Sequence, residues 1–239
     1  MWKVQQERIV ADSSGHPEST NVANELDEMV TRYDKRKRRG LSAWKHQYYE
    51  RARQERDVVF AKWLTDRFPD RGKLRCLEVG AGSGKNIPSL QRFGIPLQQI
   101  TANELLVDRL SELTEEHPEV QTIAGNAMDI SAGPYDVILV STVFTSILDE
   151  SFRKQLASHL IGLLADEGCV LWYDFSYQNP LNKDVSGITI AQLRELFAER
   201  EVLAERITLT PPVALLVGPF YKCLAWIPFL KSHVAAIVS

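Results

Sequence analysis

The sequence predicts an α/β sandwich in which helices cover both faces of a mostly parallel sheet. Three observations support this prediction. Short runs of β-branched and other apolar residues recur along residues 73–176, helical patterns lie between them, and two further strand-like runs follow near the end of the chain. Runs that are apolar nearly throughout are typical of strands buried on both faces, and their alternation with helices favours right-handed crossovers.

The expected elements of the middle zone follow one another in strict alternation. The strands are expected at Leu74–Val79, Ile100–Asn103, Val120–Ala124, Tyr135–Ser141 and Cys169–Phe175. The helices between and after them are expected at Gly84–Phe93, Leu106–His117, Glu150–Leu164 and Thr189–Glu199.

The end of the chain has a different pattern. Glu201–Thr210 alternates apolar and polar residues in part, and His233–Val238 is a second strand-like run. If the two runs pair, they form an antiparallel hairpin that residues 211–230 interrupt. This insertion contains four prolines, which exclude one continuous helix, and it lacks the roughly twenty consecutive apolar residues of a membrane span. The sequence leaves three roles open for this insertion: a peripheral contact with a membrane, a packed flap, or a contact in a dimer. It also leaves open whether the protein is a monomer or a homodimer.

The size and composition of the chain favour one large domain with an extension. Its 239 residues exceed the roughly 150 that are typical of one domain. With 44% apolar and 25% charged residues, the chain has the composition of a globular protein, which excludes a disordered or fibrous one. Residues 1–72 are polar and rich in helix formers. We therefore expect an N-terminal helical cap over 1–72 and a sheet-containing domain over 73–239.

Charge and cysteine content narrow the class of protein further. The net charge of −3 gives the whole molecule no general affinity for nucleic acid. Cys76, Cys169 and Cys223 lie in apolar runs and cannot all pair within one chain, which favours buried, reduced thiols. No Cys/His cluster has the spacing of a zinc site, so we expect no metal. Since the first eight residues also lack the apolar stretch of a signal peptide, we expect a cytoplasmic protein.

The most specific local pattern is a glycine loop that follows the first expected strand. Three glycines stand at alternate positions, two residues after an acidic residue, in the segment Glu78-Val79-Gly80-Ala81-Gly82-Ser83-Gly84. Such glycines allow a tight turn and a close approach of a ligand to the backbone. A phosphate-binding P-loop would need a glycine at position 79 and a hydroxyl at position 86, and a dinucleotide fingerprint would need a glycine at 85. Val79, Asn86 and Lys85 exclude both.

This loop resembles the first motif of class I S-adenosylmethionine-dependent methyltransferases, and the resemblance extends over residues 73–176. Glu104 stands twenty residues beyond Gly84, where such enzymes place the carboxylate that binds both ribose hydroxyls. Residues 125–129, Gly-Asn-Ala-Met-Asp, stand where the family usually has Gly-Asp-Ala and contacts adenine. Asn126 departs from the usual Asp, but its amide oxygen can still accept a hydrogen bond from the adenine amino group.

The resemblance implies a doubly wound, seven-stranded, mostly parallel sheet with an antiparallel C-terminal hairpin and S-adenosyl-L-methionine as the cofactor. The residues it implies for cofactor binding are Glu78, Gly80, Ala81, Gly82, Gly84, Glu104, Leu105, Asn126, Ala127, Met128 and Ser141. Two alternatives stay open from the residues alone. Glu104 could be a charge at a helix N-terminus, and Asn126 a plain turn residue.

The methyl acceptor is indicated only by a finer resemblance. Residues 141–149, 171–188 and 210–212 resemble a bacterial subfamily found with genes for surface polysaccharides, which implies transfer to an oxygen of a sugar or glycan precursor. The first stretch lacks the Asn/Asp-Pro-Pro-Tyr sequence of enzymes that methylate DNA nitrogens, so we expect no DNA partner. We expect Thr142, Phe144, Trp172 and Tyr48 to contact the acceptor, although aromatic residues at strand ends often belong to the core.

A hydroxyl acceptor would also require a base to remove its proton. Asp174, at the end of the fifth expected strand, is the first candidate, and the alternative for it is a carboxylate that binds loop amides. His46, in the N-terminal cap, is the second candidate. A run of six cations and one acid at residues 32–39 could attract an acidic acceptor, dock RNA or protein, or be a solvated surface. A catalytically silent, cofactor-binding regulatory subunit also remains possible from the sequence.

Overall fold

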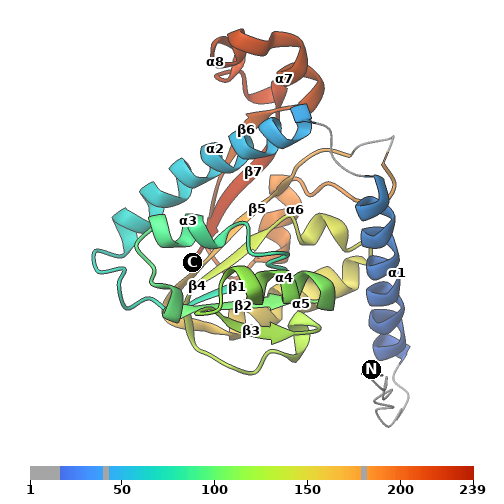
Figure 1. The fold of residues 1–239 in the computed structure, drawn as a ribbon, viewed down its shortest axis with the longest axis vertical. Helices are drawn as coiled ribbons and strands as arrows, with labels where there is room; N and C mark the ends of the chain where they lie inside the picture. The colour runs from blue at the N-terminus through green and yellow to red at the C-terminus, as the bar shows by residue number, and fades with distance from the viewer. Residues whose placement is uncertain (1–16, 40–42, 179–181) are drawn as a thin grey trace.

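A single seven-stranded sheet runs through the computed structural model, which describes residues 17–39, 43–178 and 182–239 (Figure 1). The strand order is β3-β2-β1-β4-β5-β7-β6. The strands are β1 (Cys76–Val79), β2 (Ile100–Glu104), β3 (Gln121–Ala124), β4 (Tyr135–Ser141), β5 (Leu164–Phe175), β6 (Val202–Leu209) and β7 (Lys231–Val238). All seven expected strands are present. β4 has the expected bounds, and the other six have shifted ends.

The pairing directions confirm the expected fold class. β1 pairs in parallel with β2 and β4, β2 with β3, and β4 with β5. β7 lies antiparallel between β5 and β6. The strand order reverses beside β1, and in an open sheet this is where a crevice forms at the carboxyl ends of the strands.

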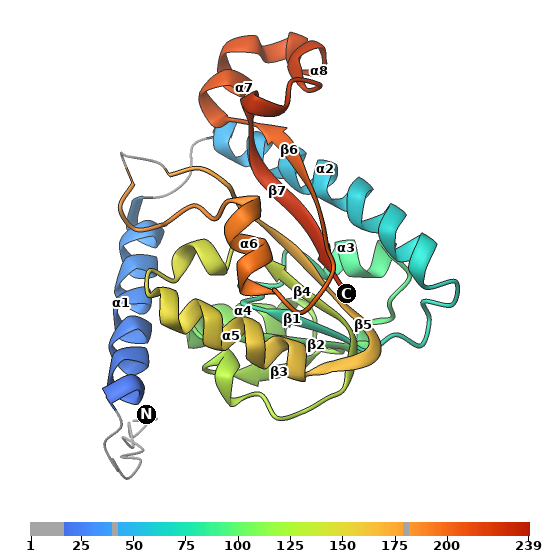
Figure 2. The same ribbon diagram turned by 180° about the vertical axis from the view of Figure 1, so that it is seen from behind.

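Helices cover both faces of the sheet, and each face has its own apolar core cluster (Figure 2). The helices are α1 (Pro17–Arg39), α2 (Ala43–Arg67), α3 (Ile87–Arg92), α4 (Val107–Glu116), α5 (Glu150–Gly162), α6 (Ile190–Leu196), α7 (Pro211–Val217) and α8 (Tyr221–Leu224). Short 3₁₀ turns lie at Leu97–Gln99, Ala127–Asp129, Phe144–Ser146, Gly218–Phe220 and Pro228–Leu230.

Two element boundaries differ from the sequence expectation for local reasons. α3 begins at Ile87 instead of Gly84, because Gly84 has a φ of +79° that is incompatible with a helix. β5 begins five residues earlier than expected, because Leu164 already pairs with Tyr135 of β4 across a local irregularity in the register.

The two N-terminal helices lie on different sides of the molecule. α1 runs along one edge in both ribbon views, and α2 crosses the other side (Figures 1 and 2). Phe60 and Leu64 of α2 are fully buried in a core cluster that also includes strand residues. α2 is therefore part of the packed core, whereas α1 contributes Met29 to the opposite cluster.

The insertion between β6 and β7 breaks into short helices, as its prolines predict. It forms α7, α8 and two 3₁₀ turns that project beyond the ends of the strands (Figure 1). None of the helices in the described part of the chain is long and apolar enough to cross a membrane. Cys76 and Cys169 are buried free thiols, but Cys223 in this insertion is exposed, which corrects the expectation of three buried cysteines.

Candidate functional site

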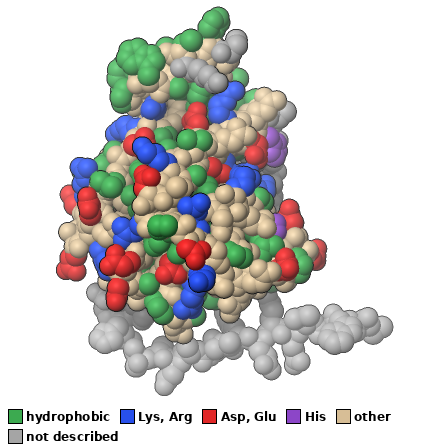
Figure 3. All heavy atoms as spheres, turned by 90° about the vertical axis from the view of Figure 1, so that its left-hand side faces the viewer, with side chains coloured by type: hydrophobic (Ala, Val, Ile, Leu, Met, Phe, Trp, Pro, Cys, Tyr) green, Lys and Arg blue, Asp and Glu red, His purple; other side chains and the backbone are tan. Residues whose placement is uncertain are grey.

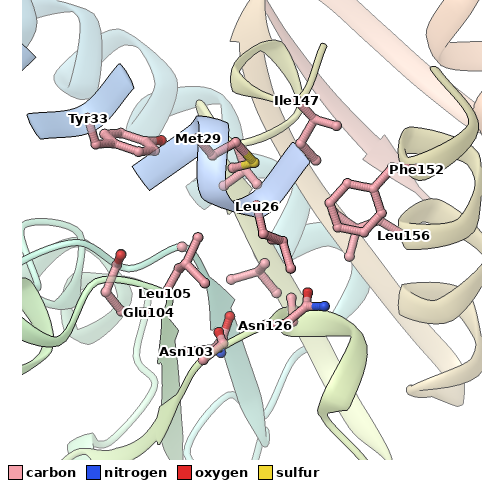
Figure 4. A pocket seen from close by; sticks show the side chains of 15 residues that line it. Leu26, Met29, Tyr33, Asn103, Glu104, Leu105, Asn126, Ile147, Phe152 and Leu156 are labelled. Atoms are coloured by element: carbon pink, nitrogen blue, oxygen red, sulfur yellow. The ribbon is translucent and has the colours of Figure 1, made fainter. Parts of the chain in front are cut away.

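Two cavities meet at the glycine loop, where β1, β2 and β4 end. One has a volume of about 60 Å³, and we call it the closed pocket because helix α1 forms part of its wall. The other is an open cleft of about 620 Å³. Gly80 lines both cavities. The walls of the closed pocket come from α1, the ends of β1 and β2, the segment after β3, and α5 with the loop before it (Figure 4). The arrangement suits an elongated ligand that passes across Gly80 from one cavity to the other.

Most of the residues expected to bind the cofactor gather around these cavities. Those that line the closed pocket are Gly80, Glu104, Leu105, Asn126 and Ala127. Those that line the cleft are Gly80, Ala81, Gly82 and Ser141. Three of the expected residues, Met128, Gly84 and Glu78, line neither cavity. Met128 packs beside a core cluster, and Glu78 is buried behind the loop.

Gly80 has to be a glycine for two reasons. Its φ is +65°, and a Cβ built on it would lie 2.7 Å from Cγ2 of Val143. Residues with side chains rarely adopt this conformation, and such a contact would force the backbone to move. The loop can therefore bring its main chain close to a ligand on either side.

Glu104 is the acidic residue at the end of β2, and it is only 5% exposed. Oε2 of its carboxylate accepts a hydrogen bond from the Gly82 amide at 2.7 Å, and Oε1 accepts one from the Leu106 amide at 2.9 Å. Each carboxylate oxygen keeps a second lone pair that could accept a hydroxyl. Leu106 is the N-cap residue of α4, so the alternative of a charge at a helix N-terminus stays open beside the place of Glu104 in the wall of the closed pocket.

Glu78 is a buried carboxyl beneath the same loop. Oε1 accepts a hydrogen bond from the Asn86 side-chain amide at 2.7 Å, while buried Oε2 has no hydrogen-bond partner among the described residues. Burial raises the pKa of Glu78 to about 7, although the hydrogen bond from Asn86 opposes the rise. A buried acceptor oxygen without a donor is costly unless a ligand supplies the donor. An ammonium group would satisfy it.

Asn126 combines the two roles that the sequence left open. It lines the closed pocket, and its Oδ1 accepts a hydrogen bond from the Met128 amide at 3.1 Å, which caps the 3₁₀ turn after β3. The same segment is supported by Asn103, whose amide donates to the carbonyls of Ile123 and Gly125. Sequence reasoning missed Asn103 because it was assigned to the strand itself.

Helix α1 closes the pocket from outside the sheet. Leu26, Met29 and Tyr33 line it, and Figure 4 shows them on the side opposite Asn103 and Asn126. The sequence did not indicate these residues because α1 has no motif, and its apolar positions only show that one face is buried.

Arg32 fastens α1 over the pocket. Its guanidinium donates to Glu25 at 2.6 Å and to the carbonyl of Ser146 at 3.1 Å, and its side chain is only 11% exposed. Glu25 in turn accepts a hydrogen bond from the Leu148 amide at 2.7 Å. Arg32 is thus not available as a free docking charge. Of the other cations in the basic run, Lys35 is exposed, and the side chains of residues 36–39 lie outside the described part.

The open cleft is lined by cationic and aromatic side chains. Its charged lining consists of four cations and two acids: Arg53, Arg56, Lys85, Arg109, Glu50 and Glu112. Its aromatic lining consists of Tyr49, Tyr173 and Phe175. The expected acceptor residue Thr142 and the candidate base His46 also line this cleft. Their positions agree with the expected roles, which stay predictions.

Arg56 connects helix α2 to the glycine loop. It is 2% exposed, forms an ion pair with Asp57 at 2.7 Å, and donates to Oδ1 of Asn86 at 2.8 Å and to Oγ of Ser141 at 3.0 Å. The Asn86 amide nitrogen in turn donates to Glu78, so Arg56 also holds the Asn86 side chain in place against the Glu78 carboxyl. The sequence did not indicate Arg56, because nothing local distinguishes it from its charged neighbours in α2.

His233 of β7 lies in the wall of the cleft and is 1% exposed. Its ring stacks on Tyr173 at 5.1 Å between centroids, and Nδ1 lies 3.0 Å from Oγ of Ser232. Burial lowers the pKa of His233 to about 3, so its imidazole is neutral at physiological pH. A neutral imidazole can orient a hydroxyl by accepting its hydrogen bond.

The structure does not place Asp174 in either cavity. It is fully buried, and its carboxylate accepts hydrogen bonds from the hydroxyl and amide of Thr145 and from the Phe175 amide. Burial raises its pKa to about 6, and the hydrogen bonds from Thr145 oppose the rise. Asp174 is thus a carboxylate that binds loop groups, which is the alternative considered from the sequence. The geometry does not support the expected role of Asp174 as the base.

Three of the expected acceptor contacts are also displaced. Phe144 and Trp172 are fully buried in the core cluster on the α5 face, as aromatic residues at strand ends often are. Tyr48 donates its hydroxyl to the Leu209 carbonyl at 2.9 Å and lines a separate hollow beside α7. The side chains alternate across the sheet, and this alternation turns Trp172 away from the cleft that Tyr173 lines.

Known proteins resemble this chain both in sequence and in fold. No family model matches it. An uncharacterized methyltransferase-like protein of Schizosaccharomyces pombe is 30% identical over 110 residues, which are 45% of this chain and 42% of that protein. An uncharacterized methyltransferase of the same organism is 33% identical over 93 residues, 39% of this chain and 36% of that protein. The matches thus cover less than half of these curated relatives.

Solved structures match nearly the whole chain at low identity. Magnesium protoporphyrin IX methyltransferase from Synechocystis PCC 6803 with bound S-adenosylmethionine superposes with a TM-score of 0.62 and 15% identity, covering 95% of this chain and 99% of that one. A 1,6-didemethyltoxoflavin N1-methyltransferase from Burkholderia thailandensis superposes with a TM-score of 0.62 and 14% identity. This match covers 96% of this chain and 92% of that one. Together with the strand order, these matches show that the chain has the Rossmann-like fold of class I S-adenosylmethionine-dependent methyltransferases.

Proposed function

We propose that this chain is an S-adenosylmethionine-dependent methyltransferase that methylates an oxygen of a sugar or glycan precursor. The single observation behind the proposal is the pair of cavities that meet at Gly80. In a bound cofactor the adenosine part would lie beside Glu104 at the closed pocket, which would have to widen beyond its 60 Å³ by a movement of α1, and the methionine part would cross Gly80 into the cleft. The methyl group would then face the cleft, where an acceptor has room to approach.

The residues around the two cavities fit this cofactor. Glu104 offers a buried carboxylate to the two ribose hydroxyls, a strong form of hydrogen bonding. The unpartnered Oε2 of Glu78 suits the ammonium of the methionine part. Leu105 and Ala127 provide apolar contacts for adenine, beside the amide of Asn126.

The lining of the cleft supports a polar acceptor with a planar or ring-shaped face. Tyr49 and Phe175 offer aromatic surfaces on which a sugar face could stack, and Arg109 suits a phosphate or an acidic sugar. Arg53 already pairs with the Glu50 carboxylate at 3.0 Å. The structural neighbours act on diverse substrates: their names include magnesium protoporphyrin IX, 1,6-didemethyltoxoflavin and plantazolicin. The acceptor therefore has to be argued from this cleft, and the sugar remains a proposal.

The reaction is a displacement on a carbon that the cofactor already activates. A hydroxyl acceptor would take the methyl group that bound S-adenosylmethionine supplies, and the proton of that hydroxyl would have to pass to a base. The task of the protein is to align the two reactants and exclude water. We assign the removal of the hydroxyl proton to His46, which lines the cleft from α2. We assign the orientation of the hydroxyl to the neutral imidazole of His233, which lines the same cleft.

Two experiments test the proposal in sequence. Calorimetry with S-adenosylmethionine and S-adenosylhomocysteine should detect binding that Glu104→Ala weakens. A labelled methyl group should then pass to a member of a panel of nucleotide sugars and lipid-linked glycans. Cofactor binding without transfer to any acceptor in a cell extract would favour the catalytically silent regulatory subunit. If the methyl group passes instead to RNA or protein, and if neutralising the cations of residues 35–39 abolishes this transfer, the chain would be an RNA or protein methyltransferase. We expect the enzyme to work in the cytoplasm, without DNA.

A further inference from the structure

The insertion between β6 and β7 exposes a cluster of large apolar side chains. The exposed fractions are 60% for Leu215, 87% for Leu216, 68% for Phe220, 75% for Trp226 and 82% for Phe229. We call these five residues the apolar tip. Single exposed apolar residues are ordinary, but a contiguous group of this size usually marks an interaction surface.

The apolar tip stands clear of the rest of the molecule. α7 and α8 project beyond the sheet in both ribbon views (Figures 1 and 2), and the space-filling view shows hydrophobic side chains gathered on this projecting end (Figure 3). A stable contact between two copies would bury roughly 800 Å² per partner on matching surfaces, which a narrow projection does not readily supply.

The inner side of the insertion is anchored, so its outer side is presented in a defined orientation. Tyr221 of α8 is 4% exposed, and its hydroxyl donates to Glu55 at 3.1 Å and accepts a hydrogen bond from the Leu209 amide at 3.0 Å. The guanidinium of Arg51 lies 4.4 Å above the Tyr221 ring. This anchor holds α8 against α2, and Leu215 lines a hollow beside α2. The other four tip residues stay between 68% and 87% exposed.

The charge of the segment points to one kind of partner. Residues 211–231 contain two lysines and no acidic residue or arginine. Lys45, near the start of α2, is exposed, and its neighbour Trp44 lines a hollow together with Leu215. Within this segment the charged residues are all cations, and apolar and aromatic side chains accompanied by lysines suit the interface of a membrane with anionic lipids, where Trp and Phe enter the headgroup region and lysines meet the lipid charge.

We infer that the apolar tip inserts into the surface of a lipid bilayer that contains anionic lipids, with no spanning segment involved. This docking does not depend on the proposed reaction. If the proposed function also holds, the docking would deepen it, because His233 in the cleft lies two residues along β7 from Lys231 at the base of the insertion. At about 3.3 Å per strand residue the distance along the strand is about 7 Å, so the cleft and the base of the insertion share one end of β7.

Vesicle flotation of the whole chain tests this inference. The vesicles consist of phosphatidylcholine alone or of phosphatidylcholine with phosphatidylglycerol. We expect the protein to float with the mixed vesicles and less with the neutral ones, and added salt should weaken the binding. The double variant Trp226→Ser/Phe229→Ser should bind at least about tenfold more weakly, which corresponds to about 1.4 kcal/mol.

The matched control replaces two equally exposed apolar residues elsewhere, Val58→Ser/Val107→Ser, which are 73% and 71% exposed in the parent chain. It should float like the parent. Unchanged circular dichroism and unchanged cofactor affinity by calorimetry would show that the tip variant is folded, independently of any methyl transfer. Failure of the parent to float, equal flotation of the tip variant, or conversion of a dimer to a monomer by the tip variant without vesicle binding would each overturn the inference.

Discussion

The Glu104 carboxylate at the end of β2 accepts a hydrogen bond from the Gly82 amide of the glycine loop at 2.7 Å. The residue proposed to bind ribose thus also fixes the loop proposed to bind methionine. A substitution of Glu104 should therefore affect both halves of the cofactor site.

Glu104→Ala should weaken the binding of S-adenosylmethionine at least about tenfold, because a charge-assisted hydrogen bond contributes about 1.5–3 kcal/mol. Glu104→Gln should weaken it less, since the amide oxygen can still accept the Gly82 amide. Titration calorimetry measures both, with the exposed Glu116→Ala as the control. An unchanged affinity in Glu104→Ala would remove the ribose assignment.

Glu78 should make folding and cofactor binding depend on pH in opposite ways. Its pKa is raised to about 7 by burial, so the folded state favours the protonated form. Its contribution to the free energy of unfolding is fully present below the unfolded pKa of about 4.5 and is lost as the pH rises through about 7. Chemical denaturation of the cofactor-free protein at several pH values should show this loss, and Glu78→Gln should abolish it.

Cofactor affinity should instead rise as the pH passes through about 7, because ionised Glu78 attracts the ammonium of the cofactor. The isosteric Glu78→Gln should bind more weakly and lack this rise. If the parent and the variant show the same pH profile, Glu78 does not contact the ammonium.

Asp174→Asn should lower stability far more than turnover. The carboxylate accepts hydrogen bonds from Thr145 and Phe175 in the core, and an amide cannot accept all of them, which costs about 1–3 kcal/mol. Urea denaturation gives the stability, and turnover is normalised to the folded fraction. Asp166→Asn, an exposed carboxylate in the same strand, is the control. A large loss of turnover in a stably folded Asp174→Asn would restore its role as the base.

His46→Gln should lower turnover by about a hundredfold or more, the usual effect of removing a general base, while cofactor affinity stays the same. The neighbouring Lys45→Gln should retain activity, because it keeps the imidazole. Steady-state kinetics across pH distinguishes a base from a structural residue, since only a base would remove a titration from the profile. Equal turnover in both variants would leave the cleft without the proposed base.

Arg32→Ala should loosen α1 and weaken cofactor binding by about fivefold, the loss of roughly 1 kcal/mol, because the guanidinium joins α1 to the Ser146 carbonyl beside the pocket. Lys35→Ala on the same helix should have little effect, as this lysine is 57% exposed. Hydrogen exchange of α1 amides provides a second measurement. Unchanged exchange and affinity would show that Arg32 does not fasten the helix.

Local patterns were sufficient to predict every strand and the glycine loop. Apolar runs and glycine spacing depend on neighbours in the chain, and they indicated Gly80. Glu104 and Asn126 were indicated by the resemblance to methyltransferases, and the structure places both beside Gly80 in the wall of one pocket. The acceptor side was less predictable. Asp174 and Tyr173 are adjacent in β5, yet the pleat sends one into the core and the other into the cleft. A strand buried on both faces has no sequence pattern that distinguishes them.

The sequence by itself determined the sheet, the strand–helix alternation and the cofactor loop, because these follow from backbone preferences and burial over a few neighbouring residues. Only the tertiary structure decided which side chains meet across the sheet. Arg56 reaches Asn86 from thirty residues away, Arg32 reaches the loop before α5, and His233 enters the cleft from the last strand. These contacts join segments that are distant in the chain, and their geometry depends on how whole helices and strands pack together.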